Sequence, residues 1–274
     1  MKRVLVVGVA ALGVIAAGCS SSSKSGGTGG STSPSESSGS SAPASSSSGA
    51  ATLSGSITVD AGSSLLSAFN TLKAQFEAAH PGTTITINYG ASSDFATQIN
   101  QGAPVDVFAS ASKKNMTQIG SAAVDPVDFV SNTAEIAVPP SNPAHIASVA
   151  DLAKSGVKVA VCAPAVPCGV LATQVFANAK VTVHPKASLA DVKTTLATVE
   201  SGEVDAGIVY VTDVRAAGSK VTGIPIAADV NAKTVYPIAA LKSSKNAALA
   251  AAFVAYVLSS AGKQVLTADG FSAP

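Results

Sequence analysis

The sequence predicts an α/β fold with two lobes, each a mixed sheet flanked by helices. Strand-length apolar stretches alternate with amphipathic, helix-length stretches from about residue 53 onward. The strand–helix order starts again after Asn132, and one more strand and helix follow the second unit. We expect this late pair to return to the first unit. The chain would then cross twice between the lobes, with a cleft between them.

The first unit reads as strand, helix, strand, helix, strand, the order of an open sheet covered on both faces. Its strands are expected at 57–59, 84–88 and 105–109, and its helices at 65–79 and 93–100. In the first helix, apolar side chains recur at steps of three and four residues from Leu65 onward, and the stretch His80-Pro81-Gly82 ends it.

The second unit repeats the alternation. Strands are expected at 134–138, 157–161, 206–210 and 235–241, with helices beginning near 169 and 189 and a terminal helix around 249–257. Because the last strand and helix are assigned to the first unit, lobe 1 covers 53–132 plus 233–274 and lobe 2 covers 133–232. The two crossings, near Asn132 and Asn231, would form a hinge.

Residues 1–18 have the character of a signal peptide, a positively charged start followed by an apolar run at 4–17 that is short for a membrane span. The run ends in Ala16-Ala17-Gly18-Cys19, which resembles a bacterial lipobox, with Ala in the place usually taken by Leu. We expect Cys19 to be lipidated; an incidental cysteine after an ordinary signal peptide is the alternative. Residues 19–52 are nearly all small or polar, which predicts a disordered tether.

The composition argues against several classes of function. The net charge is +1, Trp is absent and aromatic residues make up 4%, so neither a basic footprint nor a stacking platform for nucleic acid is expected. The chain contains no phosphate-binding loop, no Gly-x-Ser-x-Gly elbow and no paired metal-ligand motif. Its three histidines fall in apparent loops near prolines, a pattern typical of surface residues.

Two cysteines remain once Cys19 is assigned to a lipid. Cys162 and Cys168 are separated by five residues, and an exported domain can oxidise such a pair. We predict a disulfide between them that closes a small loop. Two unpaired buried thiols are the alternative.

Four short loops share a chemistry that indicates an anion site. Each is small, uncharged and placed where a helix is expected to begin; the loops are 61–64, 90–93, 166–169 and 187–189. First-turn N–H groups have no partner inside a helix and carry partial positive charge, so they attract anions. A serine at one such position is usually only a helix cap, but four loops on two facing lobes favour a shared site.

The candidate site lacks cations. No Lys or Arg lies in the four loops, so the donors would be neutral, and Ser64, Ser92 or their neighbours are the candidate side chains. A site made only of donors favours a fully deprotonated oxyanion. Asp60 and Asp94 lie close enough in sequence to accept from a protonated one, although Asp94 is more simply explained as a complement to the helix dipole.

A series of motifs, in order along residues 55–272, resembles a known family. The motifs are Ile57-Thr58-Val59, 61–65, 91–93, 96–99, 102–110, Val166-Pro167-Cys168-Gly169, 207–213, Tyr236-Pro237-Ile238 and Gly270-Phe271. Together they are similar to those of the molybdate-binding proteins of ABC importers. The resemblance implies a type II-like periplasmic-binding-protein fold that closes on its ligand by a hinge.

The resemblance also implies which groups hold the oxyanion. By motif these are the side chains of Ser64 and Ser92, the backbone N–H groups of Cys168 and Val192, and the hydroxyl of Tyr210. Cys stands at the Pro-Gly turn where the family usually has Ala, and the doubled serines at 63–64 and 92–93 leave each serine position open by one residue. On residue patterns alone, Val192 would be a core residue and Tyr210 a buried strand residue.

The implied function is capture of molybdate, and also tungstate, outside the membrane and delivery to an ABC permease with a cytoplasmic ATPase. Such a protein is no enzyme, needs no cofactor, coordinates no metal directly with its side chains and acts as a lipid-anchored, extracytoplasmic monomer. The alternatives are a binding protein for sulfate or another tetrahedral oxyanion, an exported serine hydrolase with a cleft serine as nucleophile, and a structural or adhesive lipoprotein without a small ligand.

Overall fold

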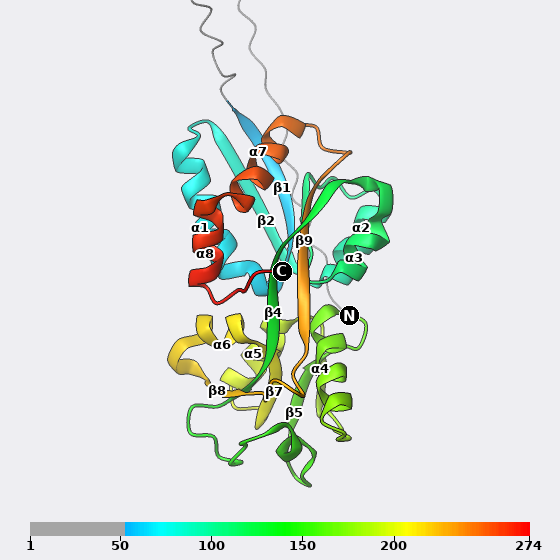
Figure 1. Ribbon diagram of the computed structural model, residues 1–274, viewed down its shortest axis with the longest axis vertical. Helices are drawn as coiled ribbons and strands as arrows, with labels where there is room; N and C mark the ends of the chain where they lie inside the picture. The colour runs from blue at the N-terminus through cyan, green and yellow to red at the C-terminus, as the bar shows by residue number, and fades with distance from the viewer. Residues whose placement is uncertain (1–52) are drawn as a thin grey trace, which may run out of the picture. The chain divides into compact units, whose positions relative to one another are not determined.

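A computed structural model describes residues 53–274 of the chain; the predicted signal peptide, Cys19 and the tether lie outside these residues. The nine strands of the described part form one sheet: eight follow the order β2-β1-β3-β9-β4-β7-β5-β6, and β8 pairs with β4 off this path. The sheet is mixed and is flanked by helices (Figure 1), as the sequence predicts. Among the described residues no single helix is long and apolar enough to cross a membrane.

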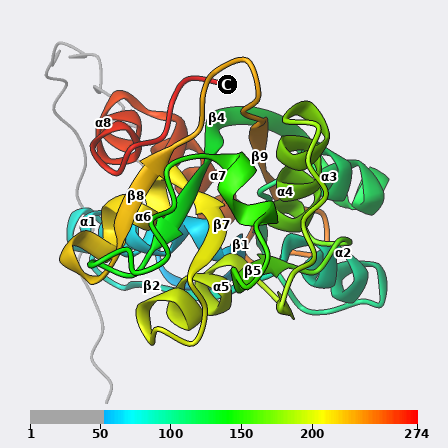
Figure 2. The same cartoon turned by 90° about the horizontal axis from the view of Figure 1, so that it is seen from below.

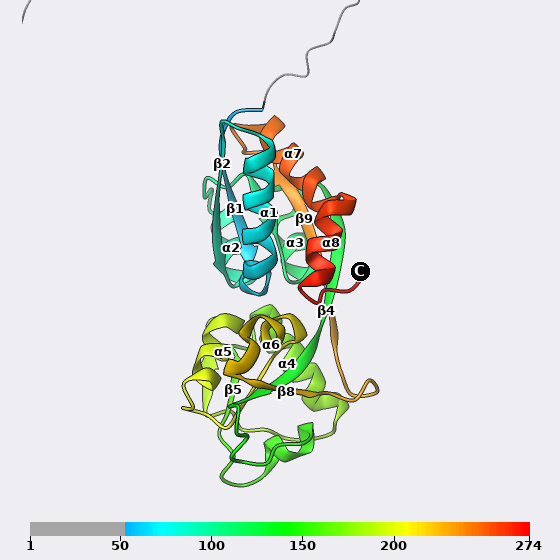
Figure 3. The same cartoon turned by 90° about the vertical axis from the view of Figure 1, so that its left-hand side faces the viewer.

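We propose to divide the described residues into the two lobes that the sequence predicts. Lobe 1 contains β1 (Gly55–Gly62), the short 3-10 helix η1 (Ser63–Leu65), α1 (Leu66–Ala79), β2 (Thr83–Gly90), α2 (Ser92–Asn100), β3 (Val107–Ala109), α3 (Lys113–Ile119), η2 (Gly120–Ala122), α7 (Ala247–Leu258) and α8 (Ser260–Ala268). Helices α1, α7 and α8 lie on one face of its sheet and α2 and α3 on the other (Figure 3).

Lobe 2 has the same layered arrangement. It contains η3 (Val149–Ala153), β5 (Val159–Cys162), α4 (Pro167–Asn178), β6 (Ala187–Leu189), α5 (Val192–Glu200), β7 (Ala206–Tyr210), α6 (Val211–Ala217), η4 (Gly218–Lys220) and β8 (Thr222–Pro225). Helix α4 covers one face of its sheet and α6 the other (Figure 2).

One long strand, β4, passes between the lobes, and β9, which begins where the chain returns to lobe 1, pairs with it. Strand β4 (Ala123–Val138) pairs antiparallel with β9 (Lys233–Leu241), and its last residues pair with β7 and β8. The β4–β9 pairing runs through Asn132 opposite Thr234. Asn132 is buried and donates from Nδ2 to the hydroxyl of Thr212 at 2.8 Å, which ties the crossing strand to α6.

Each lobe has its own hydrophobic core. In lobe 1 the rings of Phe69 and Phe76 both meet Phe253 edge to face, which packs α1 against α7. The core of lobe 2 is built from strands β4, β5 and β7 and the inner faces of α4 and α5. Ala91 of lobe 1 also packs into that second core, so the start of α2 lies against lobe 2.

Three differences from the predicted elements have local causes. The segment Ala187–Leu189 does not open a helix; it is the edge strand β6, parallel to β5, and α5 begins three residues later, where the side chain of Asp191 caps it. Strand β4 begins about ten residues before the predicted strand, because a bulge around Asp125, whose φ is positive, breaks the alternation. The short helices α3, α6 and α8 were not predicted.

Candidate functional site

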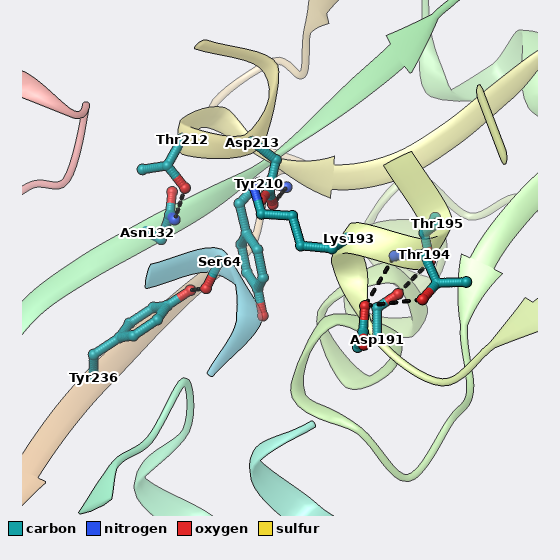
Figure 4. Close-up of polar contacts among 10 residues, drawn as sticks. All are labelled: Ser64, Asn132, Asp191, Lys193, Thr194, Thr195, Tyr210, Thr212, Asp213 and Tyr236. Carbon is teal, nitrogen blue, oxygen red and sulfur yellow. Dashed lines mark hydrogen bonds and ion pairs between the residues drawn. The ribbon is translucent and has the colours of Figure 1, made fainter. Parts of the chain in front are cut away.

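The first candidate serine lies where β1 turns into α1. Ser64 is in η1, is 5% exposed, and its Oγ lies 2.8 Å from the hydroxyl of Tyr236 on β9 (Figure 4). Ser63, the other member of the pair, is equally buried. Ser64 and Tyr236 are far apart in the sequence. They meet because β1 pairs with β3 and β3 pairs with β9.

The second candidate serine begins helix α2. Ser92 is 1% exposed, and its Oγ accepts a hydrogen bond from the N–H of Ala111 at 2.9 Å. A backbone N–H can only donate, so the Ser92 proton is not used in this bond. A Cβ at Gly62 would lie 3.1 Å from Ser92 Oγ, so the turn after β1 lies directly against this serine. The neighbouring Ser93 is less buried and donates to Asp94 at 3.2 Å.

Two helices of lobe 2 begin with free backbone donors. Cys168 is the second residue of α4, and Val192 is the first residue of α5; both are buried. Within residues 53–274, neither of their N–H groups has a hydrogen-bond partner, as expected in the first turn of a helix. The side chain of Asp191 caps α5 by accepting from the N–H of Thr194 at 2.9 Å, which leaves the Val192 N–H free.

A disulfide holds the beginning of α4. Cys162, the last residue of β5, is bonded to Cys168, with their Cα atoms 5.6 Å apart. The adjacent Gly169 has no room for a side chain, because a Cβ there would overlap the carbonyl oxygen of Ala163. Cys162 Sγ also lies 3.4 Å from the hydroxyl of Thr195 on α5, so the disulfide is next to both helix starts.

Tyr210 is a buried polar side chain without a partner. It ends β7, is 1% exposed, and its hydroxyl has no hydrogen bond to any described residue. Its ring lies beside the segment that carries Ser64 (Figure 4), and its centroid is 6.2 Å from that of Tyr236. Burial raises the pKa of Tyr210 well above its ordinary value, so the hydroxyl keeps its proton and can donate.

An ion pair between half-buried Lys193 and buried Asp213 connects α5, which begins at Val192, with α6, which follows Tyr210. Asp213 is fully buried, its Oδ1 lies 3.0 Å from Lys193 Nζ, and its Oδ2 accepts from the N–H of Tyr210 at 3.1 Å. Burial raises the pKa of Asp213, and the Lys193 ammonium acts in the opposite direction. Sequence reasoning missed this pair, since no spacing rule connects a residue of α5 with one of α6.

The two acids considered as acceptors are already engaged. Asp60 is buried and accepts from Asn88 Nδ2 at 2.8 Å; burial raises its pKa and the bond from Asn88 lowers it. Asp94 is exposed and accepts from Ser93. In the described part of the chain, no group of three or more His, Cys, Asp or Glu side chains could hold a metal ion.

Contacts between elements bring several of the five candidate donors near one another. Ser64 and Ser92 lie on adjacent turns of lobe 1, and helix α5 of lobe 2 contacts η1. Tyr210 approaches from lobe 2 and packs against Tyr236 of lobe 1. Such an arrangement can hydrogen-bond a ligand that only accepts, and it contains no cation among the five.

The chain is similar to known solute-binding proteins along most of its length. Residues 57–272 match the family model described as bacterial extracellular solute-binding protein. The molybdate-binding protein ModA of Mycobacterium tuberculosis is 38% identical over 222 residues, which cover 80% of this chain and 85% of that protein. A Bacillus subtilis protein named as an ABC transporter substrate-binding lipoprotein is 32% identical over 80% of this chain and 86% of its own.

Among solved structures, the periplasmic molybdate-binding protein of Azotobacter vinelandii shares the fold. The TM-score is 0.70 at 21% sequence identity, and the match covers 80% of this chain and 99% of that one. At this identity the likeness supports the fold alone.

The disulfide gives a stability prediction. We expect Cys162→Ala combined with Cys168→Ala to lower the free energy of unfolding by about 2 kcal/mol, because the open loop gains entropy in the unfolded chain. For a domain of this size the melting temperature should fall by roughly 4–8 °C. Thermal unfolding followed by circular dichroism measures this. The unmodified protein in reductant should match the double variant, and an unchanged melting temperature in reductant would contradict a disulfide in solution.

Proposed function

Because this chain belongs to the family of bacterial extracellular solute-binding proteins, we propose that it captures molybdate outside the membrane and delivers it to an ABC importer. The observation that most favours an oxyanion is the unpartnered hydroxyl of Tyr210. A buried polar group without a partner costs roughly 1–3 kcal/mol, so its presence suggests that a ligand completes its hydrogen bonding. An oxyanion between the lobes would do so.

The chemistry of the donors favours a fully deprotonated ligand. The proposed ligands of the anion are the hydroxyls of Ser64, Ser92 and Tyr210 and the N–H groups of Cys168 and Val192. Each is neutral, and a hydrogen bond from a neutral donor to a charged acceptor contributes about 1.5–3 kcal/mol. Molybdate and tungstate are tetrahedral dianions without protons at neutral pH, so they present acceptors to all five groups.

The two-lobed arrangement suggests how the ligand is enclosed. The chain passes between the lobes at Asn132, on β4, and at Asn231, just before β9, so bending at these two points would open and close the cleft. Three of the proposed donors come from lobe 2 and two from lobe 1. A bound oxyanion would therefore join the lobes and favour the closed state.

The transport partners follow from the family. We propose a membrane permease with a cytoplasmic ATPase as the receiver, and a monomeric binding protein. The lipobox-like Cys19 supports a lipid anchor, and the name of the Bacillus subtilis relative fits that proposal. Export would also suit the disulfide, which persists in oxidising compartments.

The serine contacts favour binding over hydrolysis. In the described part of the chain, Ser64 is bonded to a phenol and Ser92 to a backbone N–H, and neither contacts an imidazole or a carboxylate. A nucleophilic serine needs a general base within hydrogen-bond reach. We therefore propose that these serines bind the ligand and do not attack it.

Calorimetric titration with molybdate tests the proposal. We expect tight binding close to one molybdate per chain, with tungstate similar and phosphate silent. Sulfate has the same charge and shape but is smaller, so it should bind much more weakly. Binding heat with sulfate or phosphate and none with molybdate would support the oxyanion site but contradict molybdate as its ligand.

The two serines should each contribute to affinity. We expect Ser64→Ala and Ser92→Ala each to raise the Kd for molybdate by roughly 10- to 100-fold, since each removes one hydrogen bond to a charged ligand. Ser201→Ala is the matched control, because its exposed hydroxyl donates to the carbonyl of Thr198 at the end of α5 opposite Val192. Unchanged affinity in both inner variants would place the site elsewhere.

Tyr210→Phe should change affinity and stability in opposite directions. Without ligand, removal of the unpartnered hydroxyl should raise the free energy of unfolding by about 1 kcal/mol. With molybdate, the lost donor should raise the Kd by roughly tenfold or more. Denaturant unfolding of the ligand-free protein and calorimetry measure the two effects. A variant that is both less stable and unchanged in affinity would show that the hydroxyl has a structural role instead.

A further inference from the structure

Tyr236 lies behind the proposed donors and is not one of them. It is on the crossing strand β9, is fully buried, and its hydroxyl is 2.8 Å from Ser64 Oγ. Its ring meets Phe271 edge to face at 5.5 Å and Tyr210 at 6.2 Å. The hydroxyl is thus held at one position, against the serine that begins the α1 side of the cleft (Figure 4).

The bond between Tyr236 and Ser64 can run in either direction. Each hydroxyl has one proton and can also accept. If Ser64 donated to Tyr236, its only proton would be used, and its lone pairs would face the ligand. A deprotonated oxyanion cannot donate to lone pairs, so that direction would leave two acceptors facing each other.

At Ser92 the direction of the corresponding hydrogen bond is fixed by the backbone, and the serine accepts. Its Oγ accepts from the Ala111 N–H, which cannot accept in return, so the Ser92 proton is left for the cleft. At Ser64 a side chain takes the place of that N–H. If Tyr236 donates to Ser64, the two serines are equivalent: each Oγ accepts one hydrogen bond from the protein, and each hydroxyl proton is free to bind the ligand.

We propose that Tyr236 is a positioning residue of the oxyanion site, whose hydroxyl donates to Ser64 Oγ and so directs the Ser64 proton to the ligand. This inference rests on the proposed function. Burial raises the pKa of Tyr236, so the phenol stays protonated and remains a donor. A chain of donors from Tyr236 through Ser64 also polarises the Ser64 hydroxyl, which strengthens its bond to an anion.

The test is a double-mutant cycle measured by calorimetry with sodium molybdate. Tyr236→Phe removes only the hydroxyl and keeps the ring packing, and we expect it to raise the Kd about fivefold to tenfold. In the Ser64→Ala background the same change should alter the Kd by less than about twofold, because the hydroxyl through which Tyr236 acts is gone. The ligand-free melting temperature of each variant is recorded to show that it is folded.

Tyr256→Phe is the matched control, since its hydroxyl donates to Gln75 Oε1 at 2.9 Å on the outer surface and is expected to leave the Kd unchanged. An unchanged Kd in Tyr236→Phe, or an equal loss with and without Ser64, would overturn the inference while the proposed function stands. If the unmodified protein bound none of molybdate, tungstate or sulfate, the proposed function and this inference would both be overturned.

Discussion

The antiparallel pairing of β4 with β9 is the interaction on which the rest of the described structure depends. Strand β4 runs from one hydrophobic core to the other, and β9 pairs with its lobe 1 part up to the crossing at Thr133 and Lys233, so the same backbone hydrogen bonds that complete the sheet also hold the crossing in place. Strand β9 carries Tyr236 toward Ser64, and β4 carries Asn132 toward Thr212. The parts of the candidate site that come from β1 and β7 are aligned because each is tied, directly or through β3, to this central pair.

The candidate site follows from one constraint on buried polar groups. Every donor in the interior must find an acceptor, and the protein satisfies most of them from within. Among the described residues, the donors left without an acceptor include the N–H groups at the starts of α4 and α5 and the hydroxyl of Tyr210. Unmet donors without a nearby cation suit a ligand that is charged and accepts only. The charge of Lys193 is balanced by its ion pair with Asp213, and this ion pair joins α5 to α6.

The disulfide shows how a departure from the family pattern can be compatible with the proposed function. The donor proposed at the Pro-Gly turn is a backbone N–H, so the side chain of residue 168 is free to differ. Here that side chain is bonded to Cys162, which attaches the start of α4 to the end of β5. Gly169 allows the same turn to approach the backbone at Ala163. The turn is thereby held in place by covalent and steric means together.

The sequence alone determined the α/β alternation, the positions of the long helices and strands, and the family, because these depend on local periodicity and on ordered motifs. It also identified Ser64 and Ser92 as candidates from their places at helix starts. Pairing across the chain cannot be predicted in this way: the residues of the edge strand β6 have the pattern of a helix start, and the ion pair of Lys193 with Asp213 has no sequence signal. Only the tertiary structure decided that Tyr236 lies behind Ser64 and that Tyr210 is buried without a partner, because both facts depend on which distant strands become neighbours in the sheet.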